Sequence, residues 1–197
     1  MKTKISGDKD SGRGLLDNEK LALINIIKGN MRQTKPPDIS KDLNRLAFAV
    51  MVFKDLGPTP VAHYNMNFMK KDPNSLLLKF GILLMTAIGQ GTSYYEGLYG
   101  PFPVHGYKDQ LAYVYSFFIY DNSIKDCRIQ NRAYSTLILF FPRRITNCLQ
   151  ASFKIISQVL SRAFSEITDI QELTESFLEK IKDQLKFAID YWHLLSC

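Results

Sequence analysis

A chain of 197 residues with 46% hydrophobic residues can build one folded domain with a real core, which excludes a globally disordered protein. The formal charge of +6 is unevenly spread: residues 1–45 carry ten Lys and Arg against six Asp and Glu, whereas residues 46–197 carry fifteen against thirteen. The basic excess therefore lies mainly at the N-terminus, where a solvated tail is favoured over contact with an anionic membrane or a nucleic acid.

The cysteines and the apolar runs indicate a cytoplasmic protein. Cys127, Cys148 and Cys197 form no pair motif, which is typical of a reducing cytosol. The first fourteen residues are polar and Gly-rich and show no signal peptide. The longest apolar stretch, near residues 76–88, is shorter than the about 20 residues of a membrane span and contains Lys79. We therefore expect a cytoplasmic location, either free or peripheral at a membrane.

The N-terminal part of the chain predicts an extension to the main domain. Residues 1–14 indicate a flexible tail, and apolar residues then recur at helical spacing over about 17–30. Pro36-Pro37 cannot continue that helix and marks a linker. The chain is thus divided into a tail at 1–14, a helix and linker at 15–44, and a folded domain at 45–197.

The folded domain begins with two strands and a helix. The continuous apolar run at 46–53 predicts a central strand over 46–54 that is covered on both faces, and a second strand follows at 59–65, after the turn residues Gly57-Pro58. The run at 76–88 predicts a helix, because Asp72-Pro73 is a strong helix start. This helix is apolar nearly all round, so we expect the N-terminal helix or another subunit to cover its second side.

Three further strands and two helices complete the domain. Aromatic and β-branched residues predict strands at 94–106, 111–120 and 134–141. Apolar residues then step by three or four over 145–167 and again from Ile170 to Trp192, which predicts two long amphipathic helices. Thr168-x-x-Gln171 indicates a capping box that opens the second helix.

No combination of residues predicts catalysis, a metal ion or a cofactor. His63, His105 and His193 lie in different segments, without the spacing of metal ligands. Cys148 follows two arginines that could lower its pKa, but its spacing favours a place in the core. Gly89-Gln90-Gly91 ends a helix, whereas a phosphate-binding loop opens one.

Nucleic-acid binding and lipid anchoring are disfavoured as well. The aromatic residues at 113–118 lack the interleaved basic residues that base stacking requires, so packing in a core or an interface is favoured. The ending His-Leu-Leu-Ser-Cys is not a prenylation box, because no residue follows Cys197.

The predicted order β-β-α-β-β-β-α-α resembles the longin domain of the roadblock/longin group over about residues 45–194. The segment from Phe53 to Tyr64, with Gly57-Pro58 at its turn, is similar to the hairpin of longin domains in DENN-type, folliculin-type and nitrogen-permease-regulator-type proteins. The resemblance implies an α/β (α+β) sandwich with a five-stranded, mainly antiparallel sheet, here with an N-terminal helical extension. The chain departs from the SNARE-type members, because no heptad coiled coil or membrane anchor follows the domain.

Domains of this group are protein-interaction modules. They pair with another longin or roadblock domain, and the pair engages a small Ras-like GTPase. The resemblance therefore implies a non-enzymatic subunit or regulator of such a GTPase in vesicle trafficking or signalling. A homodimer and a weak peripheral membrane contact through the basic N-terminal arm stay open. The expected partner-binding residues are Leu77, Phe80, Leu84 and Ile88 on the apolar helix, with Gly57 and Pro58 shaping the hairpin.

Two other classes of function stay open. A small-molecule sensor of the PAS, GAF or profilin-like type also packs helices on a sheet, but two long C-terminal helices in tandem favour the longin-like arrangement. An enzyme using Cys148 or His105 is disfavoured, because no set of nucleophile, base and orienting group can be assembled.

Overall fold

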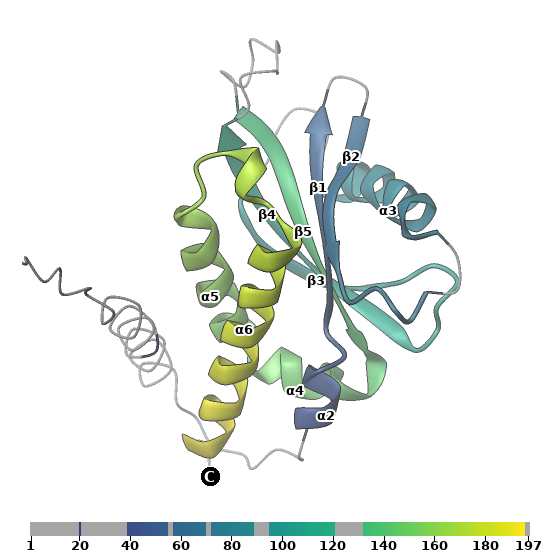
Figure 1. The fold of residues 1–197 in the computed structure, drawn as a ribbon. Helices are drawn as coiled ribbons and strands as arrows, with labels where there is room; N and C mark the ends of the chain where they lie inside the picture. The colour runs from purple at the N-terminus through teal and green to yellow at the C-terminus, as the bar shows by residue number, and fades with distance from the viewer. Residues whose placement is uncertain are drawn as a thin grey trace, which may run out of the picture.

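The computed structural model describes residues 39–54, 57–69, 72–88, 95–120 and 132–195, together with Lys20. In this part of the chain, five antiparallel strands form an open sheet in the order β2-β1-β5-β4-β3, with helices packed on both faces (Figure 1). The α+β class and the five-stranded antiparallel sheet are thereby confirmed. Apart from Lys20, the predicted tail and N-terminal helix lie outside the described residues.

The elements run in the predicted order, with four short helical segments added. Their bounds are α2 (Ser40–Leu43), β1 (Ala47–Lys54), β2 (Gly57–Tyr64), α3 (Pro73–Ala87), β3 (Gly97–Pro103), β4 (Gln110–Tyr120), β5 (Arg132–Pro142), the 3-10 turn η1 (Arg143–Ile145), α4 (Thr146–Ala151), α5 (Phe153–Ser165), the 3-10 turn η2 (Ile170–Glu172) and α6 (Glu175–Leu195). In Figure 1, α5 and α6 cover one face of the sheet, and α3 lies against the other.

The central strand β1 divides its side chains between two cores. Phe48, Val50 and Val52 belong to the core beneath α5 and α6. Ala49 and Met51 belong to the core beneath α3. Because alternate residues of a strand point to opposite faces, an uninterrupted apolar run is what a sheet covered on both sides requires. The prediction of a two-sided central strand is confirmed.

The larger core is rich in aromatic rings. Tyr115, Phe117 and Phe164 stack on one another, with ring centroids of Phe117 and Phe164 4.1 Å apart, and Phe177 of α6 meets Phe164 edge-on at 5.4 Å. Tyr113 is also fully buried in this core. The aromatic residues of β4 on this face thus pack against helices, as the sequence predicts, and are not displayed to solvent.

Two details of the C-terminal helices differ from the prediction. The predicted helix at 145–167 consists of two helices, α4 and α5, because the backbone turns at Ser152. Helical hydrogen bonds reach this residue from both sides: Ser152 N donates to Cys148 O, and Ser152 O accepts from Ile156 N. The capping box lies one residue later than predicted. Asp169 is the capping residue and Glu172 its reciprocal partner, and together they open the turn η2 before α6.

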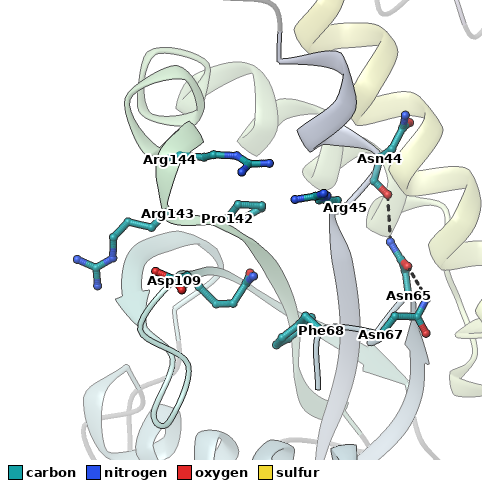
Figure 2. A pocket seen from close by; sticks show the side chains of 10 residues that line it. Asn44, Arg45, Asn65, Asn67, Phe68, Asp109, Pro142, Arg143 and Arg144 are labelled. Carbon is teal, nitrogen blue, oxygen red and sulfur yellow. Dashed lines mark hydrogen bonds between the residues drawn. The ribbon is translucent and has the colours of Figure 1, made fainter. Parts of the chain in front are cut away.

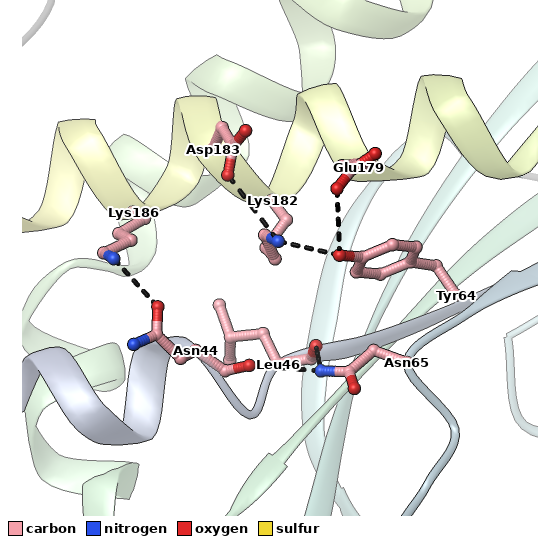
Figure 3. Close-up of polar contacts among 8 residues, drawn as sticks. All are labelled: Asn44, Leu46, Tyr64, Asn65, Glu179, Lys182, Asp183 and Lys186. Atoms are coloured by element: carbon pink, nitrogen blue, oxygen red, sulfur yellow. Dashed lines mark hydrogen bonds and ion pairs between the residues drawn. The ribbon is translucent and has the colours of Figure 1, made fainter.

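A polar network fastens the edge strand β2 to α6. Tyr64 Oη accepts a hydrogen bond from Lys182 Nζ (2.8 Å) and donates one to Glu179 Oε1 (3.3 Å), as Figure 3 shows. Lys186 Nζ donates to Asn44 Oδ1 (2.8 Å) one turn further along the same helix. The contacts of Tyr64 join α6 to the end of β2, and the contact of Lys186 joins it to the end of α2.

Both edge strands carry two prolines, Pro58 and Pro60 in β2 and Pro101 and Pro103 in β3. Proline has no backbone N–H, so each removes a donor from a strand that has a neighbour on only one side. Such residues protect sheet edges against strand addition by another chain. No helix of the described residues is long and apolar enough to cross a membrane.

Candidate interaction surface

Helix α3 begins where the sequence predicts a start signal. The Asp72 side chain accepts a hydrogen bond from Asn74 N (3.2 Å), and Pro73 occupies the first turn. The inner face of the helix then packs on the sheet: Leu77, Phe80 and Leu84 are at most 3% exposed. The ring of Phe80 lies 6.0 Å, between centroids, from that of Phe140 in β5.

Gly81 lets α3 lie unusually close to β1 and β2. A Cβ atom at this position would stand 2.6 Å from Pro58 Cβ and 2.8 Å from Met51 Cε, well inside the ordinary contact distance of about 3.5–4.0 Å. Only glycine fits there without a shift. Gly81 and Pro58 therefore hold the helix at a fixed height above the edge of the sheet.

The outer face of α3 is apolar and open to solvent. Leu78, Ile82 and Leu83 are 47%, 53% and 48% exposed, which places them among the large exposed hydrophobic residues of the described chain. The remaining exposed residues of the helix are Asn74, Ser75, Lys79, Thr86 and Ala87, so Lys79 carries the one charge on this face among the described side chains. We call Leu78, Ile82 and Leu83 the outer patch.

The predicted partner-binding residues do not belong to the outer patch. Leu77, Phe80, Leu84 and Ile88 lie in the core beneath α3, where the sheet already covers them. Pro58 is buried against Gly81, and Gly57 holds a backbone φ of +108° opposite Lys54 in the hairpin. The residues expected to bind a partner are therefore covered by the sheet, and the solvent-facing Leu78, Ile82 and Leu83 were not among them.

The residues considered for catalysis or metal binding, Cys148, His63 and His105, come from separate parts of the described fold. Cys148 is buried, and desolvation, with a smaller contribution from Asp190, raises the pKa of its thiol to about 12. This is opposite to the lowering that a reactive cysteine requires. His63 and His105 are exposed on separate elements. No group of three His, Cys, Asp or Glu residues in the described ranges could hold a metal ion; the side chain of His193 and the Gly89-Gln90-Gly91 segment lie outside them.

Comparison with protein-family models, curated proteins and solved structures gives no match to this chain.

Proposed function

We propose that the protein is a longin-like interaction module that docks on a partner domain of the same group through the outer patch of α3, and that the pair regulates a small Ras-like GTPase. The observation that carries this proposal is the outer patch itself, three large aliphatic side chains on one face of a helix with a single nearby charge. The order of strands and helices, with α3 on one face and the C-terminal helices on the other in the described part of the chain, supports the choice of group.

The geometry favours packing of a helix face over addition of a strand. Both sheet edges carry prolines that remove hydrogen-bond donors. A partner that packs on the side chains of α3 needs no backbone hydrogen bonds from this domain. Fully burying a Leu or Ile side chain contributes about 1.5–3 kcal/mol, and roughly half of that gain is still available at each outer-patch residue. The resulting few kcal/mol fall below the cost of association. The partner must therefore also contact residues around the helix.

The interior leaves little support for the sensor alternative. The space between α3 and the sheet is filled by Met51, Phe80, Leu84 and Phe140, and the space beneath α5 and α6 by the aromatic cluster of Tyr115, Phe117 and Phe164. A sensor domain of the PAS or GAF type needs a cavity for its ligand in that position.

The test is direct binding of purified Ras-like GTPases and of purified longin or roadblock proteins encoded by the same genome, measured by biolayer interferometry. Ile82→Asp places a charge in the outer patch and should weaken a genuine interaction at least about tenfold, since an unpaired buried charge is costly. Gln150→Asp introduces the same charge at an exposed position of α4 and is the matched control. Binding that survives Ile82→Asp, or a panel in which nothing binds and α3 gains no protection from hydrogen exchange, refutes the proposal.

A further inference from the structure

A cavity of about 590 Å³ opens at the end of the sheet where α2 leads into β1 and β5 leads into η1 (Figure 2). Its size falls within the usual range of ligand pockets, about 300–1,000 Å³. No residue of α3 lines it, so it is separate from the outer patch. The lining residues come from four distant segments: Asn44, Arg45, Asn65, Asn67, Phe68, Asp109, Gln110, Pro142, Arg143 and Arg144.

Arg144 is held in place by Asp42. Its Nε donates to Asp42 Oδ2 (2.7 Å), and its Nη2 donates to Asp42 Oδ1. This two-pronged contact fixes the plane of the guanidinium group, and it uses two of the five N–H donors that an arginine carries. Three donors remain, on a side chain whose orientation is already fixed.

Arg45 complements Arg144 across the cavity. Figure 2 shows the two guanidinium groups extending toward each other above Pro142, whereas Arg143 extends away from the cavity. Neither Arg45 nor Arg143 forms an ion pair with a side chain in the described ranges. The charge of Arg45 contributes only a coulombic attraction that lowers the pKa of Asp42. Two cationic groups from different elements thus converge with hydrogen-bonding capacity unused.

Asn65 holds the wall from which Arg45 extends. This residue holds a left-handed backbone, φ 55°, which asparagine tolerates better than most residues. Its Nδ2 donates to the backbone oxygens of Asn44 (3.1 Å) and Leu46 (2.9 Å), and its Oδ1 accepts from Asn67 (3.1 Å). The wall that carries Arg45 and faces Arg144 is therefore held by hydrogen bonds within the protein before any ligand arrives, as binding sites require.

The charges select the class of ligand. Two arginines, Arg45 and Arg144, extend into the cavity, whose one acidic lining residue is Asp109; Asp42 balances Arg144 from behind, and Arg143 extends away. We propose that this cavity binds a phosphate group, carried by a lipid headgroup or by a soluble phosphate ester, between the guanidinium groups of Arg45 and Arg144. Planar guanidinium groups suit phosphate oxygens, which accept several charge-assisted hydrogen bonds at once. Phe68 supplies an apolar surface beside them.

Heteronuclear NMR of the full chain tests the site with inorganic phosphate, titrated at constant ionic strength against sodium chloride. We expect saturable shifts at the amides of residues 44–45, 67–68 and 109–110. Arg45→Gln should weaken the apparent affinity about tenfold or more, the usual effect of losing a charge-assisted hydrogen bond. Arg162→Gln, an exposed arginine of α5, removes the same charge elsewhere and should leave the affinity unchanged. Shifts that do not saturate, or that respond equally to both substitutions, overturn the proposal.

Vesicle flotation separates the two sources of phosphate. The probes are phosphatidylcholine vesicles with and without a phosphatidylinositol phosphate. Flotation that needs the phosphorylated lipid and is lost in Arg45→Gln assigns the cavity to a lipid headgroup. Saturable phosphate binding in NMR without flotation assigns it to a soluble ester. Flotation that survives Arg45→Gln, combined with unsaturable phosphate shifts, rejects the cavity in favour of adsorption by other basic residues.

Discussion

Gly81→Ala tests the close approach of α3 to the sheet, because two effects of opposite sign compete at this position. In an open helix, alanine is favoured over glycine by about 1 kcal/mol. Here the new Cβ would stand 2.6 Å from Pro58 Cβ and 2.8 Å from Met51 Cε. The Met51 methyl can move, but the Pro58 ring is rigid and buried, so we assign the overlap a cost of about 2 kcal/mol, within the range for overpacked cores. The variant should be about 1 kcal/mol less stable than the wild type.

Urea unfolding followed by circular dichroism measures this difference in free energy, provided that the denaturant slope is unchanged. The pair Lys79→Ala and Lys79→Gly, at an exposed site of the same helix, calibrates the helix propensity and should differ by about 1 kcal/mol in favour of alanine. If Gly81→Ala is more stable than the wild type by the difference in free energy measured between Lys79→Ala and Lys79→Gly, the close packing of Gly81 on Pro58 is refuted.

Three further predictions follow from burial and charge. Leu84→Ala should cost about 2–5 kcal/mol in urea unfolding because it opens a cavity beneath α3, whereas Leu83→Ala on the outer patch should stay within about 0.5 kcal/mol; equal costs would contradict the assignment of faces. The arginine hydrogen bond lowers the pKa of Asp42 in the folded state below 3.8, so its contribution to stability is present above that pH and is lost as the pH falls toward the lowered value. Asp42→Asn should therefore flatten the acid limb of a stability–pH profile, and an unchanged limb would count against the ion pair. With its pKa at about 12 instead of 9.0, Cys148 should hold about a thousandfold less thiolate at pH 8, and peptide mass spectrometry should find it unlabelled by iodoacetamide until the chain unfolds.

Much of the fold could be predicted because the local sequence patterns agree with how the folded domain covers each element. The run in β1 is apolar from Ala47 to Phe53 since each side of the sheet has a cover, and Asp72-Pro73 starts α3 by side-chain capping that needs no distant residue. The break at Ser152 could not be predicted. The apolar spacing continues through it, and the residue is neither glycine nor proline.

The face of α3 could not be assigned from hydrophobicity, because leucines and isoleucines occupy both sides of the helix. Gly81 is a partial signal, because a glycine in the middle of a helix can mark the side that lies closest to a neighbour. Leu77 and Leu84, four residues before and three after it, are buried on that side, but Leu78, three residues before it, is 47% exposed. The glycine alone therefore does not separate the two faces. The arginine cavity has no such local signal, because its residues come from four segments that only the folded sheet brings together.

The prolines on both sheet edges and the outer patch of α3 together restrict how this domain can associate. Strand addition needs an uninterrupted row of backbone donors, and Pro58, Pro60, Pro101 and Pro103 interrupt that row on both edges. The α5–α6 face uses its large apolar residues internally, and Tyr64 ties that layer to the sheet through Lys182. Among the described elements, α3 is the one that leaves large aliphatic side chains, those of the outer patch, exposed. A partner that buries the outer patch must therefore approach from the α3 side with a helix or a concave surface of its own, and a partner strand at either edge would contradict this inference.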